Sequence, residues 1–539
     1  MGKNNTILIL GGGIMQIPSI RIARRKGLRV VVADGNPGAP GAGMADEFLH
    51  VDLKDKERLA EEAKIIARNG GLQGVFTAGT DFSTTVAWIS EKIGLPGIPY
   101  SVALNATDKS RMRRIFKEKG IPSPEFAVVD SDKSLVERGE KIGFPMVVKP
   151  VDNMGARGVR RVDTLEDLKE AFTLAKGNSG SGRVILEEYI PGPEFSLDAI
   201  VSGGDIFICG IADRHICFSP FFVEMGHTMP SNYPEDVKDR VIRVFRDGVR
   251  ALGITDGAAK GDIKLSPSGP VIGEIAARLS GGYMSGWTYP YSSGVEVTEA
   301  AMNIAMGLPL PDLKPRQNLV SAERAFISIP GTVESILGVE KTEEEAGVKD
   351  VFLRVSPGNR VFFPTNNVEK CGNIITQAKT REEAIEIGEK GLSHIVIRLK
   401  PLSEETADFL FRDKLAWVPT AFKLTRKANL EVLNSLPVVS GSTISNEKIY
   451  IFKLPELHLE DCREWHGRTL RHAFYQVCDL GGAEALDPCS EEKCMVLGKL
   501  FWKAFLRGGV QGGLWVIDTV RSLFRVGKNL TEVVRLWEV

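Results

Sequence analysis

Short apolar runs and amphipathic segments alternate through the start of the chain, up to about residue 104. Apolar runs at residues 7–10 and 28–33 predict buried strands, and the amphipathic segment 18–26 predicts a helix between them. The same pattern returns as a strand at 72–76 and a helix at 82–93. This alternation predicts an open parallel sheet, which binds ligands at the carboxyl ends of its strands.

From about residue 105 the pattern changes to strands separated by glycine-rich turns. Helices are predicted at 109–119, 239–252 and 296–306, strands at 145–149, 159–162 and 183–188, and a hairpin at 260–276. A smaller α/β pattern follows, with strands at 325–329 and 395–399 and a helix at 381–390. Residues 403–539 are richer in Trp, His and Cys, but their spacing lacks the paired C-x-x-C of a zinc site.

Composition narrows the classes of function. The chain has 539 residues, enough for three or four domains at about 150 residues each. Its 68 basic and 69 acidic side chains balance, which argues against nucleic acid and membrane surfaces as partners. No apolar run is long enough to span a membrane, and the run at 7–10 is too short for a signal peptide. Seven scattered cysteines do not suggest a disulfide framework, so we expect a cytoplasmic protein.

The predicted hairpin at 260–276 carries the most informative pair of residues. With its turn centred near Ser268, Asp262 falls opposite Glu274. Alternation predicts one face that is apolar and one that is charged, with Ile272 as an exception on the charged face: Ile263, Leu265, Val271 and Ile275 against Lys260, Asp262, Lys264, Glu274 and Arg278. Two carboxylates across a strand pair repel unless a cation lies between them, and Mg²⁺ prefers such ligands. The alternative is a solvated face whose lysines neutralise the acids.

A lysine and a glycine-rich loop form the second candidate. The strand at 145–149 ends at Lys149, and the following loop contains Gly155, Arg157 and Gly158. Glycines expose backbone N–H groups that can surround phosphate oxygens. The loop lacks the Gly-Lys-Ser/Thr of a Walker A sequence, and an ordinary turn is the alternative interpretation.

A third candidate lies where the strand at 183–188 ends. The apolar run leads into Glu187, Glu188, Tyr189 and Ile190, and Glu194 follows shortly after. Such a segment can present an acid and backbone groups to an adenine ring, with Ile190 packed on the ring face. The alternative interpretation is an ordinary strand end.

The order of these features resembles the ATP-grasp superfamily, which includes biotin carboxylases, carbamoyl-phosphate synthase large subunits, purine-pathway ligases and amino-acid ligases. The resemblance covers roughly residues 1–400 and rests on five motifs in order: Lys109, Lys149 with its glycine loop, Glu187-Glu188-Tyr189-Ile190, Asp262, and Glu274 with Arg278. No single motif decides the matter, but their order and spacing together are specific.

The resemblance implies a fold class and domain boundaries. The fold class is α/β and α+β multidomain, beginning with a Rossmann-like, open parallel pre-ATP-grasp domain at 1–104. An ATP-grasp domain of two subdomains follows at 105–312, and a small α/β closing domain at 313–402. The remaining residues, 403–539, form an accessory domain that is mixed or helical.

The resemblance also implies roles for individual residues. Lys109 and Lys149 bind ATP phosphates, and the loop with Gly155, Arg157 and Gly158 closes over the β- and γ-phosphates. The other implied roles are adenine binding by Glu187, Glu188, Tyr189 and Ile190, ribose binding by Glu194, Mg²⁺ binding by Asp262 and Glu274, and stabilisation of an acyl phosphate by Arg278. Manganese is the alternative ion.

Two positions depart from the family pattern. The family more often has Glu where this chain has Asp262. It commonly has Asn two residues after the second acid, where this chain has Ala276. One metal contact is therefore missing or supplied elsewhere, which leaves open whether one or two ions bind.

A further stretch points to one branch of the superfamily. The segment with Glu224 and His227 is similar to one in amino-acid and dipeptide ligases, where an acid and a histidine approach the substrate. A structural loop histidine is the alternative for His227. Thr80 and Asp81 follow a predicted strand and mark a second substrate edge. The chain also lacks the Met-Lys-Met sequence of a biotinyl module.

These features together predict an ATP-dependent carboxylate–amine ligase that forms an acyl phosphate and releases ADP and phosphate. Its expected partners are a small carboxylate and an amine, with ATP and Mg²⁺, and a homo-oligomer is left open. Two alternatives remain: a bicarbonate-activating enzyme of the carboxylase or carbamoyl-phosphate synthase type, and a non-catalytic nucleotide-binding protein.

Overall fold

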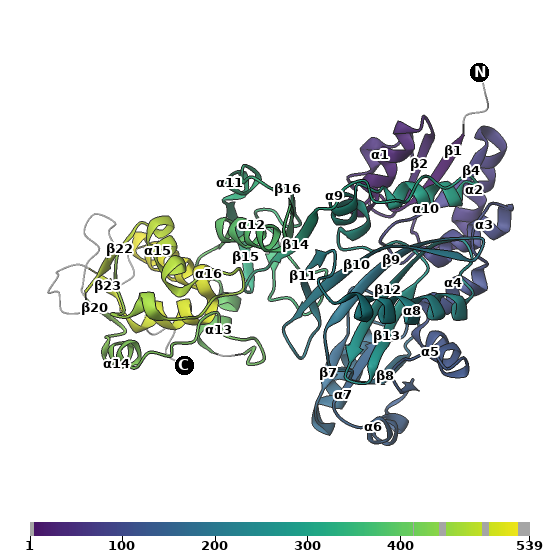
Figure 1. The fold of residues 1–539 in the computed structure, drawn as a ribbon. Helices are drawn as coiled ribbons and strands as arrows, with labels where there is room; N and C mark the ends of the chain where they lie inside the picture. The colour runs from purple at the N-terminus through teal and green to yellow at the C-terminus, as the bar shows by residue number, and fades with distance from the viewer. Residues whose placement is uncertain (1–4, 413, 441–448, 488–494, 527–539) are drawn as a thin grey trace. The chain divides into compact units, whose positions relative to one another are not determined.

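The computed structural model describes residues 5–412, 414–440, 449–487 and 495–526, which fold into two compact units (Figure 1). The first unit comprises residues 1–323 with 377–384, and the second comprises 324–376 with 385–539. Among the described residues, no helix combines the length and apolarity needed to cross a bilayer.

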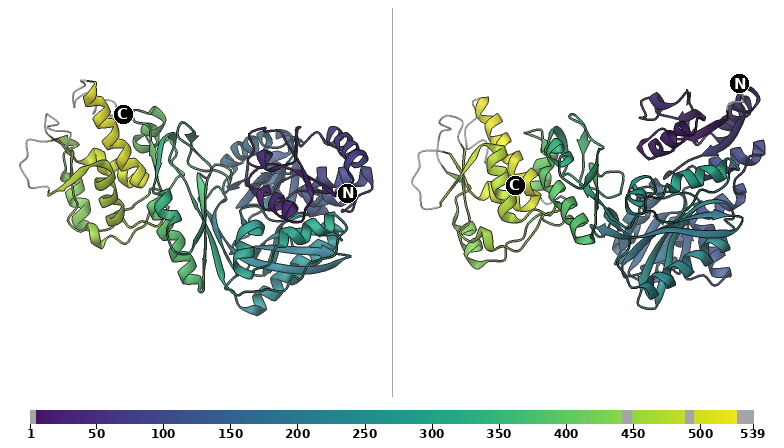
Figure 2. Two further views of the ribbon diagram at one scale, coloured as in Figure 1. Left: turned by 90° about the horizontal axis from the view of Figure 1, so that it is seen from above. Right: turned by 45° about the horizontal axis from the view of Figure 1, so that its top comes forward.

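The first unit begins with the predicted parallel sheet. Its four strands run in the order β3-β2-β1-β4 and all pair in parallel. They are β1 (Thr6–Leu10), β2 (Arg29–Asp34), β3 (Glu47–His50) and β4 (Leu72–Phe76). Every residue of β1 is buried, because helices cover both faces of the sheet. The covering helices are α1 (Ile17–Arg25) and α10 (Val297–Ala305) on one face, and α2 (Lys56–Gly70) and α3 (Ser83–Ile93) on the other, as Figures 1 and 2 show.

Two antiparallel sheets follow in the same unit. The smaller has the order β5-β8-β6-β7 and packs against α6 (Leu135–Ile142) and α7 (Leu165–Gly177). Its strands are β5 (Phe126–Val129), β6 (Met146–Pro150), β7 (Arg160–Val162) and β8 (Val184–Glu188). In the larger sheet the consecutive strands β13-β12-β9-β10-β11 belong to this unit: β9 (Glu194–Ser202), β10 (Asp205–Cys217), β11 (Val223–Met229), β12 (Gly257–Ser266) and β13 (Gly269–Ala276).

Two helices cover the larger sheet. α5 (Lys109–Glu118) and α8 (Glu235–Leu252) pack their apolar faces on it through Phe116 and Phe245. A Cβ atom at Gly261 would lie 2.5 Å from the Phe245 ring, so glycine allows the helix to approach the strand. α8 begins four residues before the predicted start at 239, because Pro234 precedes two acids that favour a helix N-terminus.

The β12–β13 hairpin confirms the predicted register and corrects one face. Asp262 pairs with Glu274, as predicted, but a bulge at Gly273 makes Ile263 pair with Ile272. The extra residue reverses the alternation beyond it. Ile272 is therefore fully buried, and the prediction that Val271 would lie on the core face was wrong.

The second unit contains a small three-stranded sheet and an antiparallel strand pair. The three-stranded sheet has the order β17-β15-β19, and β16 pairs with β18. These strands are β15 (Gly331–Leu337), β16 (Val348–Leu353), β17 (Arg360–Val361), β18 (Gly372–Ala378) and β19 (Val396–Leu399). The accompanying helices are α11 (Val339–Glu343) and α12 (Arg381–His394). The strand predicted at 325–329 is β14 (Val320–Phe326), which starts and ends earlier than predicted and includes the buried polar residues Ser321 and Glu323.

The C-terminal residues add a mixed layer to this unit. Four strands run in the order β20-β23-β21-β22: β20 (Val439–Ser440), β21 (Ile449–Phe452), β22 (Ala483–Leu486) and β23 (Val496–Leu497). The helices are α13 (Glu404–Phe411), α14 (Lys427–Ser435), α15 (Leu470–Gly481) and α16 (Lys499–Arg525). The long helix α16 breaks at Gly509, whose φ of 60° is left-handed.

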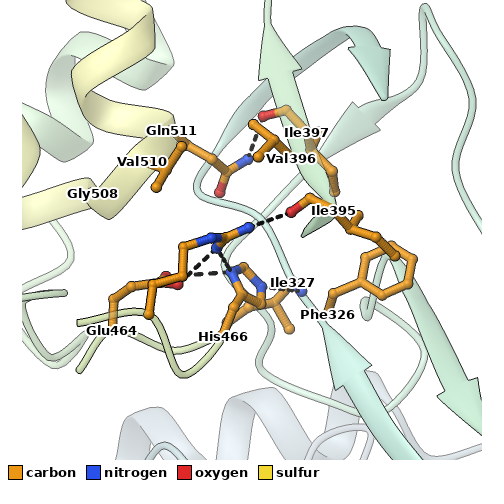
Figure 3. A pocket seen from close by; sticks show the side chains of 11 residues that line it. Phe326, Ile327, Ile395, Val396, Ile397, Glu464, His466, Gly508, Val510 and Gln511 are labelled. Carbon is orange, nitrogen blue, oxygen red and sulfur yellow. Dashed lines mark hydrogen bonds and ion pairs between the residues drawn. The ribbon is translucent and has the colours of Figure 1, made fainter. Parts of the chain in front are cut away.

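A buried polar network joins these C-terminal residues to the rest of the second unit (Figure 3). Arg468 lies 2.7 Å from the Glu464 carboxylate and donates to the carbonyl oxygens of Leu392, Ser393 and Ile395. His466 accepts a hydrogen bond from the backbone of Ile327 at 3.1 Å. Burial raises the pKa of Glu464, but His466 and Arg468 outweigh this effect and lower it to about 2.

Replacing one member of this network is expected to destabilise the second unit. Arg468→Met leaves the Glu464 charge buried without its arginine partner, a loss of about 3–5 kcal/mol in the free energy of unfolding. Arg360→Met breaks an exposed pair with Glu405 and serves as the control, which should unfold at nearly the same urea concentration as the unsubstituted protein. Urea unfolding followed by tryptophan fluorescence measures both, and equal effects would contradict a structural role for the network.

Candidate active site

Two buried lysines lie near the two predicted metal-binding acids. Lys109 begins α5, which Asp108 caps by accepting hydrogen bonds from Ser110 and Arg111. Its Nζ lies 3.3 Å from Glu274 Oε1 and donates to the Asn153 carbonyl at 2.9 Å. Lys109, which was predicted to bind ATP phosphates, thus contacts Glu274, which was predicted to bind the metal ion.

Lys149 instead pairs with an acid predicted to bind adenine. Its Nζ lies 2.6 Å from Glu187 Oε2, and the Arg113 Nε lies 2.9 Å from Glu187 Oε1. Burial raises the pKa of Glu187, but Arg113 and Lys149 outweigh this and lower it. The pKa of Lys149 is lowered, mainly by burial, although Glu187 opposes the shift. All three side chains are therefore held in one buried charge cluster.

Sequence reasoning missed Arg113. Its side chain is fully buried on α5 and donates to the Gly273 carbonyl at 2.5 Å, at the bulge of the hairpin. It therefore ties Glu187 to the hairpin that carries Glu274. Its spacing of four residues from Lys109 places both on one helix face, and that spacing was the available signal.

The predicted phosphate loop joins β6 to β7. Gly155 and Gly158 have φ angles of 65° and 71°, which favour glycine. A Cβ atom at Gly158 would lie 2.7 Å from the Asn178 side chain. Arg157 is 41% exposed, and its Nη2 lies 3.8 Å from Asp81 Oδ2. The loop is fixed at Gly158, while Arg157 reaches the second substrate edge predicted from sequence.

The segment after β8 carries the predicted adenine and ribose contacts. Tyr189 lies under the Arg161 guanidinium at 4.4 Å from the ring centroid. The Ile190 carbonyl accepts a hydrogen bond from Lys264 at 3.1 Å. Glu188 is exposed at the end of its strand. Glu188, Tyr189 and Ile190 thus follow one another at the end of β8, whereas the Glu187 side chain belongs to the charge cluster with Lys149.

Arg214 gathers three carboxylates of the site. It pairs with Glu194, with Glu224 at 2.7 Å and with Asp262 at 3.1 Å. Burial acts to lower the pKa of Arg214, but the three acids outweigh it and raise the pKa well above its usual range. The guanidinium therefore links the residues predicted to bind ribose, substrate and metal. Sequence reasoning missed Arg214, because the sequence alone does not distinguish a buried arginine on a strand from one exposed to solvent.

The acids Asp262 and Glu274 are the predicted metal ligands, and both lie among cations. Asp262 also pairs with Lys260. Burial raises the pKa of Glu274, but Lys109, Lys260, Lys149 and Arg278 together lower it to about 2. Glu274 is therefore ionised at neutral pH, which is the state that binds a metal.

The chemistry of these two acids fits Mg²⁺. Asp262 Oδ1 is buried and accepts no hydrogen bond, although it lies 3.1 Å from Arg214 Nη1 as an ion pair. Among the described residues, no three His, Cys, Asp or Glu side chains gather as a complete metal cage. Magnesium is usually held by one or two carboxylates, with waters and substrate phosphates as its other ligands. The pair therefore suits an ion that arrives with ATP better than a permanently bound one.

Arg278 and Asp81 form the other wall of this region. Arg278 Nη2 lies 4.0 Å from Asp81 Oδ1, and its Nη1 donates to the Leu279 carbonyl. Burial raises the pKa of Asp81, although Arg278 and Lys109 oppose the shift. Thr80 contacts Thr77 at 2.7 Å between hydroxyl oxygens.

His227 is buried and held on both ring nitrogens. Its Nε2 lies 2.8 Å from the Thr288 hydroxyl, and its Nδ1 lies 3.4 Å from Glu323 Oε2 and 4.0 Å from Glu224 Oε1. Glu323 lies on β14, nearly a hundred residues further along the chain, and was not predicted. The ring is oriented by a carboxylate in the manner of a general base and its partner.

Asp198 beside this site is expected to make stability depend on pH. It accepts hydrogen bonds from Ser280 at 2.9 Å, while its Oδ2 has no hydrogen-bond partner. Burial raises its pKa to about 6. Between pH 4 and 6 the unfolded chain ionises this group before the folded chain does, so Asp198 lowers stability as pH rises.

The Asp198→Asn variant removes this dependence. Relative to the unsubstituted protein, its free energy of unfolding should gain about 1.4 kcal/mol per pH unit from pH 4 to pH 6 and then level off. Urea titrations at a series of pH values measure the difference, and a difference that does not change with pH would contradict the assignment.

Two parts of the chain match known protein domains. The model of the ATP-grasp domain matches residues 142–286, and that of the L-amino acid ligase C-terminal domain 2 matches residues 325–400. The L-arginine-specific L-amino acid ligase of Bacillus subtilis is 24% identical over 285 residues, which is 51% of this chain and 68% of that protein. Carnosine synthase 1 of Gallus gallus is 29% identical over 345 residues, which is 59% of this chain but only 37% of that protein.

A solved structure shows the same fold. The L-amino acid ligase from Bacillus licheniformis aligns with a TM-score of 0.65 and 23% identity, covering 74% of this chain and 100% of that one. The predicted resemblance is confirmed. The chain thus carries an ATP-grasp domain at residues 142–286 and an L-amino acid ligase C-terminal domain 2 at residues 325–400, and its relatives include an L-amino acid ligase.

Proposed function

We propose that the chain is an ATP- and magnesium-dependent carboxylate–amine ligase that proceeds through an acyl phosphate. The observation that carries this proposal is the pair Asp262 and Glu274, opposed in register and surrounded by cations. Structural acids on a solvated face would not need four nearby cations, whereas a site for ATP phosphates and a divalent ion does.

The first half-reaction transfers the γ-phosphoryl group. Lys109 and Lys149 would neutralise the phosphate charge, and Asp262 and Glu274 would hold Mg²⁺, which stabilises charge on the phosphate oxygens. A carboxylate oxygen of the substrate attacks the γ-phosphorus, and the bond from that phosphorus to the bridging oxygen of ADP breaks. Arg278 would pair with the acyl phosphate through its planar fork, held in place near Asp81.

Closure of the glycine loop would protect this intermediate from water. Arg157 is exposed and lies near Asp81, so binding of phosphates would draw it over the nucleotide. Exclusion of water matters because an acyl phosphate hydrolyses readily.

The second half-reaction uses the amine. The nitrogen attacks the acyl carbon, the bond from carbon to the phosphate oxygen breaks, and phosphate leaves. Glu224 would bind the amine, and His227 Nε2 would accept its proton in exchange for the contact with Thr288, while Glu323 holds Nδ1. Relatives named as an L-amino acid ligase and as carnosine synthases support amino acids as the substrate class.

Removal of a metal ligand or of a phosphate lysine should abolish the first half-reaction. We expect Glu274→Gln and Lys149→Ala each to lower amino-acid-dependent ADP release by about 10²-fold or more, because each removes charge stabilisation in the transition state. Glu235→Gln, an exposed substitution on α8, is the matched control and should leave the rate unchanged. A coupled assay over a panel of amino acids measures ADP. Full activity in either variant would refute the roles given to these residues.

Glu323 should act through His227. Glu323→Leu removes the acceptor beside His227 Nδ1 and should lower kcat by about 10²-fold at an unchanged KM for ATP. Glu323→Gln keeps a side-chain oxygen there and should retain most of the rate. Steady-state kinetics distinguish the two variants, and ADP binding checks that each of them is folded. Equal losses in both variants, or a changed KM for ATP alone, would rule out this positioning role.

A further inference from the structure

A cavity lies entirely within the second unit. None of the residues that line it belongs to the candidate active site. Its volume is about 610 Å³, within the range of small-molecule sites. It is lined by the end of β15, α11, the end of α12 and one side of α15 along its whole length. The family models end at residue 400, so α15 belongs to residues that neither model covers.

The lining of this cavity is predominantly basic. Lys341 from α11, His394 from α12, and Arg471 and His472 from α15 all line it, and Asp479 is the one acid among the lining residues. Glu345 stands outside the lining, 3.7 Å from His394 Nε2, and is also engaged by Lys390 at 2.7 Å. Two permanent cations and two histidines therefore face one carboxylate.

Both histidines respond to this surplus of positive charge. Burial lowers the pKa of His394, and Lys341 lowers it further. Burial also lowers the pKa of His472, with Arg468 and Lys341 acting in the same direction. An anion in the cavity would reverse the effect of Lys341 on both rings, because a nearby negative charge favours the imidazolium.

The walls of the cavity are fixed before any ligand binds. Arg468 holds the carbonyl oxygens around Ser393, and Gln476 donates to the Ser393 carbonyl at 3.0 Å. These bonds join the end of α12, which carries His394, to α15, which carries Arg471 and His472. The Gln476 Oε1 atom is buried and has no hydrogen-bond partner, which leaves an acceptor for a hydroxyl or N–H group. Tyr475 is 48% exposed at the rim and offers a ring face.

We propose that this cavity, between the family domain and the added C-terminal residues of the second unit, binds a small anion carrying a phosphate or carboxylate group. Lys341 and Arg471 supply the permanent charge, and His394 and His472 add charge when the anion is present. The buried bonds around Ser393 join the backbone next to His394 to α15, which carries Arg471 and His472, so little reordering of this backbone is needed on binding. The cavity does not depend on the proposed ligase reaction.

The test uses the full chain labelled with ¹³C in histidine. The imidazole signals of His394 and His472, assigned with His394→Gln and His472→Gln variants, are followed during pH titrations with and without inorganic phosphate. Succinate replaces phosphate in a second series. We expect either anion to raise both pKa values by about one unit. A response to phosphate alone or to succinate alone identifies the group that the cavity takes.

Two variants decide whether the cavity is responsible. Lys341→Ala combined with Arg471→Ala should weaken anion binding at these histidines about tenfold or more, whereas Lys427→Ala, on the exposed face of α14, should not change it. The proposal is overturned if neither anion shifts the two histidines at millimolar concentration, or if the double variant responds like the unsubstituted chain. Because the signals come from these two rings, phosphate bound elsewhere and loss of ligase turnover do not affect the readout.

Discussion

Repulsion between two acids organises this site. Asp262 and Glu274 face each other across one strand pair, and like charges in that position destabilise a sheet unless cations lie beside them. The chain supplies these cations from several elements: Lys109 from a helix N-terminus, Lys260 from the same hairpin, and Arg214 from the next strands of the sheet. These side chains neutralise the pair. In the proposed reaction the same lysines would turn to the phosphates of ATP and leave the two acids to a divalent ion.

A second buried charge cluster connects this pair to the segment expected to bind adenine. Arg113 contacts Glu187 on one side and the Gly273 carbonyl on the other, so the bulge of the hairpin and the end of β8 share one guanidinium. Glu187 in turn holds Lys149. Arg214 plays the matching part for Glu194 and Glu224. Displacement of any one partner by a ligand therefore changes the charge balance of the others, which couples nucleotide binding to the substrate side through electrostatics.

The fold of the first unit and the pairing of its key acids could be predicted from the sequence, because both follow from local patterns. Strand–helix alternation predicted the parallel sheet, and the Ser-Pro-Ser-Gly turn placed Asp262 opposite Glu274. The face predicted for Val271 was wrong, because a pattern that alternates every two residues does not reveal the single extra residue at Gly273. Arg113, Arg214 and Glu323 were missed because each gains its role from a partner distant in sequence. The C-terminal residues contain no recognised motif, because the residues of their buried network come together only in the folded chain.

The central claim is that a divalent ion lies between Asp262 and Glu274 together with the terminal phosphates of ATP. A crystal structure with Mn²⁺ and a non-hydrolysable ATP analogue, with the metal located by anomalous scattering, tests it most directly. The account predicts an anomalous peak about 2.1 Å from a carboxylate oxygen of each acid and from a phosphate oxygen, with Lys109 turned from Glu274 toward the nucleotide. A bound nucleotide whose metal contacts neither acid, with both still paired to their lysines, would contradict the account.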